Sequence, residues 1–322
     1  MDKANKVSVI VPTYNGSFFI GEALASVLTQ THLPAEIIVI DDNSNDDTVS
    51  IIEGISRNAA VQIRCIRLPK NSGGPGHPLN VGVESATSEI IVVLEQDDKM
   101  RPQRIEKQLA ALQAYPQCSM VTGRFSLCGN SDGDMSPLWP VPQFAGVVED
   151  IDSRPEYFEL DQMLAFRGML TRQVAGGNSN YCFTRDSWRK LGGFNERVRV
   201  CVDVDFVLKA ILRGPVVVVN DFIMEYRVLA NSLCRQNLDD SMIEVTLVRL
   251  AFASMKRDLA GDNFRLLQTS ALGFAKVALQ QGDWQKLAAM LPALIKHTDF
   301  LREIGKKTGR YIRTNINGSR NG

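Results

Sequence analysis

Short apolar runs alternate with helical stripes along the first hundred residues of the chain. Four runs have the length and β-branched composition of buried strands: VSVIV (7–11), EIIVI (36–40), VQIRCI (61–66) and EIIVVL (89–94). Between the first two, apolar residues recur at helical spacing from Ile20 to Leu28. This rhythm predicts an α/β fold with a mixed, mostly parallel sheet flanked by helices on both faces.

The pattern changes further along the chain. Additional strands are expected at 118–123, 215–219 and 222–228, and a helix at about 203–213. Residues 129–156 lack periodicity and read as a long loop. From Ser241 onward only helical stripes occur, and Ser241-Met-Ile-Glu244 matches a capping box, which predicts that a helix starts at Ser241.

Three regions follow from these patterns: a sheet domain at 1–235, a helical C-terminal region at 236–305 and a basic tail at 306–322. Helices are expected near 263–281 and 283–301, with Pro292 kinking the second of these. The tail carries five basic residues and no acidic one. It is expected to be solvated and disordered; weak attraction to anionic lipid headgroups, at the periphery of a membrane, is the alternative.

The charge balance limits the classes of partner. The chain has 36 basic and 36 acidic residues, so no overall field favours nucleic acid or an anionic membrane as the main partner. The apolar run before Pro12 is too short for a signal peptide, and no stretch of about eighteen uncharged apolar residues occurs. A soluble, cytoplasmic protein without a transmembrane segment is expected. Six cysteines without a C-x-x-C pair favour reduced, structural thiols over a zinc site.

Three of the expected strands end in mainly polar segments. These are Pro12, Thr13, Tyr14 and Asn15 after the first strand, Asp41 and Asp42 after the second, and Glu95, Gln96, Asp97 and Asp98 after the fourth. In open parallel sheets, ligands bind outside the carboxyl ends of the strands, where these loops converge. The three loops are therefore expected to face one crevice.

Asp97 and Asp98 are candidate metal ligands. Mg²⁺ and Mn²⁺ prefer oxygen ligands and typically take one or two carboxylates from the protein. The alternative is that these acids only favour the N-terminus of a helix that starts near Pro102. Asp41 and Asp42, expected across the same crevice, favour the metal site.

Two further segments each allow two interpretations, and three other patterns are rejected as functional motifs. Asp203, in the first turn of its helix, is either a base kept ionised by the helix dipole or an ordinary capping acid. The glycine-rich segment 71–78 either cradles phosphate oxygens or is a plain loop. No G-x-G-x-x-G follows the first strand, which excludes a Rossmann dehydrogenase. The G-x-S-x-G match at 129–133 is followed by prolines where a helix is required, and the three histidines lack metal-ligand spacing.

Five segments at characteristic spacing carry a resemblance to a known family: VSVIVPTYNG, IIVIDDNSNDDT, IIVVLEQDD, GGFNE and VDVDFVLKAILRG. Residues 6 to about 235 resemble family 2 glycosyltransferases with the GT-A fold. The resemblance implies an inverting transfer of a sugar from a nucleotide sugar, usually a UDP-sugar, to a hydroxyl of a glycan or small-molecule acceptor. It also implies a divalent cation, Mn²⁺ or Mg²⁺, as cofactor.

The resemblance further implies roles for individual residues. Asp203 would be the general base, and Asp97 and Asp98 would hold the metal and the diphosphate. The nucleotide-binding residues would be Pro12, Thr13, Tyr14, Asn15, Asp41, Asp42, Asn80, Gln96 and Asp97. The acceptor side would be Gly177, Asn178 and Ser179.

The chain departs from the family pattern at several positions. Leu79 and Leu229 stand where the family commonly has arginine and histidine, Glu95 replaces an aspartate and Val202 a glutamate. A degenerate relative that binds nucleotide sugar or glycan without catalysis is therefore the alternative function. A nucleotidyltransferase, which also uses carboxylate-bound Mg²⁺, is a further alternative; it would ordinarily have a basic glycine-rich loop near the N-terminus.

The chain also lacks the Q-x-x-R-W motif of processive polysaccharide synthases, which favours transfer of a single sugar. The C-terminal helices offer a means of homo-oligomerisation.

Overall fold

The computed structural model describes residues 6–128, 143–229, 232–233, 238–281 and 283 of the 322-residue chain. These residues separate into two compact units that divide between Glu244 and Val245. The G-x-S-x-G match, the expected helix at 283–301 beyond its first residue, and the basic tail lie outside the described residues.

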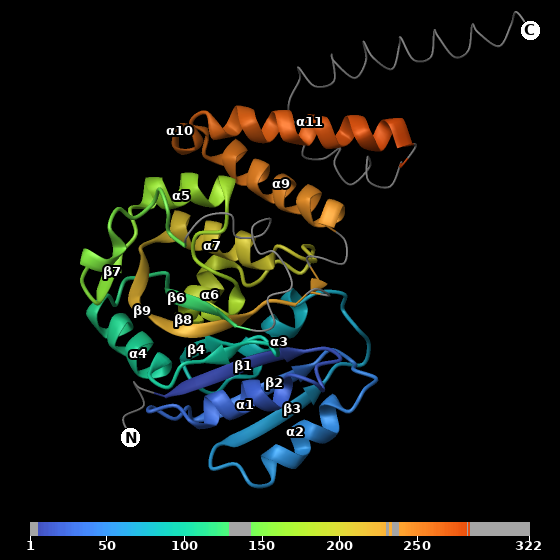
Figure 1. The fold of residues 1–322 in the computed structure, drawn as a ribbon, viewed down its shortest axis with the longest axis vertical. Coiled ribbons are helices and arrows are strands. Elements are labelled where there is room, and N and C mark those ends of the chain that lie inside the picture. The colour runs from blue at the N-terminus through green and yellow to red at the C-terminus, as the bar shows by residue number, and fades with distance from the viewer. Residues whose placement is uncertain (1–5, 129–142, 230–231, 234–237, 282, 284–322) are drawn as a thin grey trace, which may run out of the picture. The chain divides into compact units, whose positions relative to one another are not determined.

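The first unit is built on one sheet, which has nine strands in the described part of the chain (Figure 1). The strands are β1 (Val7–Thr13), β2 (Glu36–Asp41), β3 (Gln62–Arg67), β4 (Ile90–Val93), β5 (Lys99–Met100), β6 (Met120–Cys128), β7 (Tyr157–Glu159), β8 (Cys182–Thr184) and β9 (Val216–Arg227). Their order is β3-β2-β1-β4-β8-β6-β9-β5, and β7 pairs with β9. Strands β1 to β4 are parallel to their neighbours among themselves, and β8 is antiparallel to both β4 and β6. The expected mixed, mostly parallel α/β sheet is confirmed.

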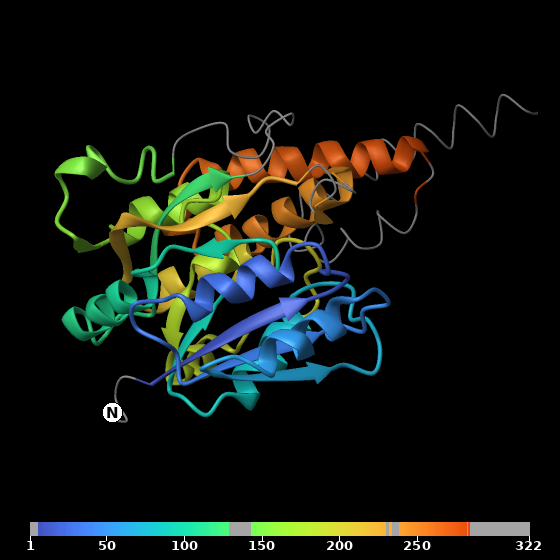
Figure 2. The same cartoon turned by 60° about the horizontal axis from the view of Figure 1, so that its bottom comes forward.

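Helices cover both faces of the sheet. They are α1 (Ile20–Leu28), α2 (Thr48–Ser56), α3 (Gly76–Ser85), α4 (Arg104–Ala114), α5 (Gln162–Thr171), α6 (Arg185–Leu191) and α7 (Val202–Arg213), with short 3₁₀ turns η2 (Ile151–Ser153) and η3 (Asn178–Asn180). Figure 2 shows α1 alongside the strands. The valines of β1 share a core with α1, while Ile10, which points to the opposite face, meets α3. Because both faces are covered, β1 is buried along its whole length.

Four features differ from the sequence-based expectations. The two runs at 215–219 and 222–228 form one strand, β9, which follows β6 through register shifts at Arg124. The short strands β7 and β8 and the helix α5 were not expected. Helix α3 begins at Gly76 and takes in part of the expected glycine-rich loop.

The fourth difference concerns the expected capping box. Helix α9 (Leu238–Met255) already includes Ser241, so the prediction that the helix starts there is wrong. The carboxylate of Glu244 accepts hydrogen bonds from the backbone of residues 199–201. The capping box assigned Glu244 to the N-terminus of its own helix. In the structure, Glu244 instead binds backbone amides of a segment distant in the sequence.

The second unit is helical in its described part, as expected. It contains the remainder of α9, α10 (Arg257–Ala260) and α11 (Asn263–Gln281). Its buried side chains include Leu250, Ala253, Leu267 and Ala271. Among the described helices, none combines the length and the apolar character needed to cross a bilayer.

The contact between α3 and β1 gives a test of the packing. A Cβ atom on Gly82 would lie 2.3 Å from Cγ2 of Ile10, so we expect Gly82→Ala to lower the free energy of unfolding by about 1–3 kcal/mol through overpacking. Gly54 of α2 is the matched control, because a Cβ there meets nothing within 4 Å; Gly54→Ala should raise stability by up to about 1 kcal/mol. Urea denaturation measures both values. A Gly82→Ala variant as stable as Gly54→Ala would contradict this packing.

Candidate active site

The polar loops after β1, β2 and β4 meet at the carboxyl edge of the sheet, as expected. The amide of Asp42 donates a hydrogen bond to the carbonyl of Thr13 (2.8 Å), which joins the first two loops. The side chain of Gln96 joins the loops after β1 and β4. Its Oε1 accepts from Oγ1 of Thr13 (2.5 Å) and from the amide of Tyr14 (2.8 Å), and its Nε2 donates to the Tyr14 carbonyl (3.2 Å).

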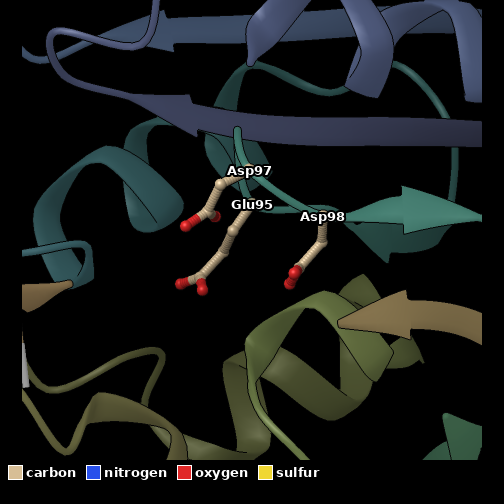
Figure 3. Close-up of side chains that lie close together, drawn as sticks. All are labelled: Glu95, Asp97 and Asp98. Atoms are coloured by element: carbon tan, nitrogen blue, oxygen red, sulfur yellow. The ribbon is translucent and has the colours of Figure 1, made fainter. Parts of the chain in front are cut away.

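Glu95, Asp97 and Asp98 form an acidic cluster (Figure 3). Each offers one carboxylate oxygen, and these oxygens lie within 4.8 Å of one another. Glu95 and Asp97 are half-buried, whereas Asp98 is 1% exposed. The expectation paired Asp97 and Asp98; the structure adds Glu95 as a third member of the group.

Segments distant in the sequence hold the acidic cluster in place. Nδ2 of Asn178 donates to Oε1 of Glu95 (3.0 Å), and Oγ of Ser179 accepts from the amide of Glu95 (2.8 Å). At the end of β9, the amide of Arg227 donates to Oδ1 of Asp98 (2.8 Å) and its Nε donates to the carbonyl of Asp97 (2.9 Å). The other oxygen of Asp98, Oδ2, is buried and accepts no hydrogen bond from the described part of the chain.

Burial and mutual repulsion make the acidic cluster hard to ionise without a cation. Burial, with added repulsion from Asp97 and Asp203, raises the pKa of Glu95 to about 7. Burial and the charges of Asp97 and Glu95 raise the pKa of Asp98 well above its ordinary value. Burial also raises the pKa of Asp97, against the attraction of Arg227. A hard divalent cation with oxygen ligands suits this donor set and would reverse these shifts.

A buried arginine behind the acidic cluster was missed by the sequence analysis. Arg104, in the first turn of α4, is fully buried; its Nη2 donates to the carbonyl of Val93 (2.9 Å) and its Nε to Oε1 of Gln108 (3.1 Å). Burial lowers the pKa of Arg104 to about 10, with Asp98 acting in the opposite direction, so it stays charged at neutral pH. The only local signal was an arginine directly beside the apolar stripe that starts at Ile105.

Asp203 lies in the first turn of α7, as expected. Its Oδ2 accepts from Nε2 of Gln173 (2.6 Å) and its Oδ1 from the amide of Val204 (2.8 Å). Its charge contributes to the raised pKa of Glu95. No pattern in the sequence pointed to Gln173, because the segment that carries it has no periodicity.

Several residues expected to contact the nucleotide are engaged with the protein itself. Asp41 pairs with Arg67 (3.4 Å), and Asp42 accepts from the amide and the hydroxyl of Ser72 (3.0 and 2.9 Å). Nδ2 of Asn80 donates to the carbonyl of Phe194 (2.9 Å) and to Oε1 of Glu196 (2.8 Å).

Other predicted residues are placed differently. The amide of Asn15 donates to Oγ of Ser44 and its Oδ1 accepts from Asn45. Pro12 lies within β1, and Tyr14 is 44% exposed. Gly177, where an added Cβ meets nothing within 4 Å, precedes η3, whose Asn178 and Ser179 bind the acidic cluster.

Comparison with known proteins shows the family to which this chain belongs. The profile of glycosyl transferase family 2 matches residues 8–167. TarS of Staphylococcus aureus, a poly(ribitol-phosphate) beta-N-acetylglucosaminyltransferase, is 36% identical over 112 residues, which is 34% of this chain and 19% of TarS. The succinoglycan biosynthesis protein ExoO of Rhizobium meliloti is 34% identical over 109 residues, covering 34% of this chain and 30% of ExoO. An uncharacterised glycosyltransferase of Nostoc is 32% identical over 108 residues, covering 34% of this chain and 33% of that protein.

Solved structures extend the likeness of fold beyond the matched segment. Residues 1–349 of S. aureus TarS in complex with UDP-GlcNAc superimpose with a TM-score of 0.66 at 22% identity, covering 92% of this chain and 81% of that one. The chain belongs to glycosyl transferase family 2 through residues 8–167, and its fold is GT-A. The segments matched in the three curated relatives span 19–33% of those proteins' own lengths.

The acidic cluster predicts a pH dependence of stability in metal-free protein. Glu95 titrates near pH 7 in the folded state and near 4.5 when unfolded, so the folded state binds more protons between these values. The free energy of unfolding should therefore fall as pH rises from about 4.5 to 7. The contribution of Glu95 over this range should be about 3 kcal/mol, and Glu95→Gln should remove it.

Urea denaturation in EDTA at several pH values measures this effect. Glu84→Gln, at an exposed acid on α3, should keep the wild-type slope. Parallel curves for Glu95→Gln and wild type would contradict the raised pKa.

Proposed function

We propose that the protein is an inverting glycosyltransferase that moves a single sugar from a nucleotide sugar, a UDP-sugar, to a hydroxyl of a glycan or small-molecule acceptor. The observation that carries the proposal is the acidic cluster at the carboxyl edge of β4, with the charge of Asp203 acting on it from α7. A transferase of this kind needs neutralisation of the leaving diphosphate and a base for the acceptor. Membership of family 2 supports this chemistry.

Asp97 and Asp98 are the proposed ligands of Mn²⁺ or Mg²⁺, with Glu95 beside them. The buried Oδ2 of Asp98 supports this role, since among the described residues it has no partner and a cation would supply one. A bound cation would stabilise the negative charge on the diphosphate. Arg104 and Arg227 contribute fixed positive charge to the same region.

Asp203 is the proposed general base. In the reaction, the acceptor oxygen bonds to the anomeric carbon from the face opposite the leaving group, the bond from that carbon to the diphosphate oxygen breaks, and the hydroxyl proton passes to Asp203. Nε2 of Gln173 donates to Oδ2 of Asp203 and the amide of Val204 donates to Oδ1, and these hydrogen bonds orient the carboxylate.

The donor nucleoside is proposed to lie against the loops after β1 and β2, with Tyr14 available for stacking. The residues proposed for nucleotide binding are Pro12, Thr13, Tyr14, Asn15, Asp41, Asp42, Asn80, Gln96 and Asp97. The solved TarS structures with UDP and UDP-GlcNAc support a UDP-sugar as donor. Gly177, Asn178 and Ser179 are proposed to line the acceptor side.

The names of the relatives support a place in the synthesis of a cell-surface polymer. TarS is named for transfer to poly(ribitol-phosphate) and ExoO for succinoglycan biosynthesis. We propose a cytoplasmic enzyme that acts on such a glycan. Its C-terminal helices are the proposed place of subunit pairing.

A second candidate, a binding protein without catalysis, is favoured by one observation. Leu79, where the family commonly has arginine, is fully buried in α3, so this position supplies no cation to a phosphate. Such a protein would bind a nucleotide sugar and would not turn it over.

Donor binding is tested by the protein's melting temperature with UDP, UDP-GlcNAc, UDP-glucose and GDP-mannose, each with and without Mn²⁺. We expect the UDP compounds to raise the melting temperature only with Mn²⁺, because the diphosphate and the acidic cluster repel each other otherwise. Asp98→Asn should abolish the shift, and Glu84→Gln should keep it. If no nucleotide stabilises the protein under either condition, the donor assignment fails.

The base is tested by the release of nucleoside diphosphate from the bound nucleotide sugar, with water as acceptor. Asp203→Asn should keep donor affinity within about threefold and lower the rate by about 10²–10⁴-fold, the usual contribution of a general base. Asp186→Asn is the matched control, at an exposed acid in the first turn of α6. Full turnover by Asp203→Asn would assign the base to another group, and no turnover by the wild-type chain would favour the binding protein.

A further inference from the structure

Glu244 binds three successive backbone amides that precede the helix of Asp203. Its Oε1 accepts from the amides of Val200 (2.6 Å) and Cys201 (2.9 Å), and its Oε2 accepts from the amide of Arg199 (2.8 Å). Three convergent N–H groups form a binding site for an anion. In this protein the anion is the side chain of a residue from α9, within the first compact unit.

Helix α7 begins directly after the backbone amides that Glu244 binds. Its N-cap residue, Cys201, makes no side-chain hydrogen bond to the first turn, and cysteine is a poor acceptor for such bonds. Glu244, from α9, therefore fixes the backbone of residues 199–201, which leads into α7. Cys201 is two residues from Asp203, so a shift of this backbone moves the carboxylate of Asp203 with it.

The same segment is also bound by α3 and by the loop that precedes α3. Asn80 holds the carbonyl of Phe194 and the carboxylate of Glu196, and Nε of Arg199 donates to the carbonyl of Gly73 (3.1 Å). An added Cβ on Gly74 would lie 2.6 Å from the carbonyl oxygen of Arg199. The stretch from Phe194 to Cys201, here called the base strap, is thus held between α3 and Glu244.

We propose that Glu244 is a positioning residue for the transfer reaction: it anchors the base strap so that Asp203 points at the acceptor. The inference rests on the proposed function of Asp203. Glu244 lies outside the segment that the family profile matches, 77 residues after the end of that segment at residue 167. The reaction would therefore depend on a residue beyond the matched segment.

The test uses the full chain and three variants: Glu244→Ala, Glu244→Gln and Asp239→Asn. Asp239 is an exposed acid in the first turn of the same helix and serves as the control. The nucleotide sugar with the largest thermal shift in the panel above is the donor, and water is the acceptor. Calorimetry gives the donor Kd with Mn²⁺, and diphosphate release gives kcat.

We expect Glu244→Ala to lower kcat by about 10–100-fold, because a misplacement of about 1 Å costs rates of this order. Its donor Kd should stay within about twofold of the wild-type value. Glu244→Gln should recover most of kcat, since one amide oxygen still accepts from Val200 and Cys201. Hydrogen exchange of the base strap should be faster in Glu244→Ala than in Glu244→Gln or in Asp239→Asn.

Two outcomes would overturn the role of Glu244 while leaving the proposed function intact. One is a kcat in Glu244→Ala within twofold of wild type. The other is an equal loss of kcat and donor affinity, which would show a structural role without selective positioning. Absence of release by the wild-type chain would instead overturn the proposed function, and this role with it.

Discussion

Repulsion within the acidic cluster is the constraint on which the rest of the site depends. Three carboxylate oxygens lie within 4.8 Å of one another where a buried strand ends, and burial strengthens their repulsion. The fold opposes this repulsion with fixed donors and charge: Asn178 on Glu95, the Arg227 backbone on Asp98, and Arg104 buried behind the cluster. A cation completes the balance in the proposed reaction.

The order of the sheet explains how such distant partners reach the cluster. Strand β8 lies between β4 and β6 and is antiparallel to both. The turn η3, which directly precedes β8, is therefore brought to the carboxyl end of β4. The end of β9 supplies Arg227 to the same place. The loop after β4 provides the acids, and η3 and the end of β9 provide groups that hold them.

Much of the fold was predictable because its first half is local and repetitive. A strand with both faces covered must be apolar throughout, so β1, β2 and β4 are visible in the sequence. Short elements such as β7 and β8 carry too few residues to establish a period. Strand β9 was divided at Asn220 and Asp221 because polar residues usually mark a turn, whereas here they lie half-buried at a register shift.

The sequence by itself determined where the acids would gather, because the carboxyl ends of parallel strands must meet at one edge of the sheet. It also placed Asp203 in the first turn of a helix. Only the tertiary structure decided their partners. Gln173 reaches Asp203 across 30 residues, and Glu244 binds the backbone amides just before α7 in place of its expected local role. A local pattern records what a residue does to its own helix or strand, and it carries no information on which distant backbone groups need an acceptor.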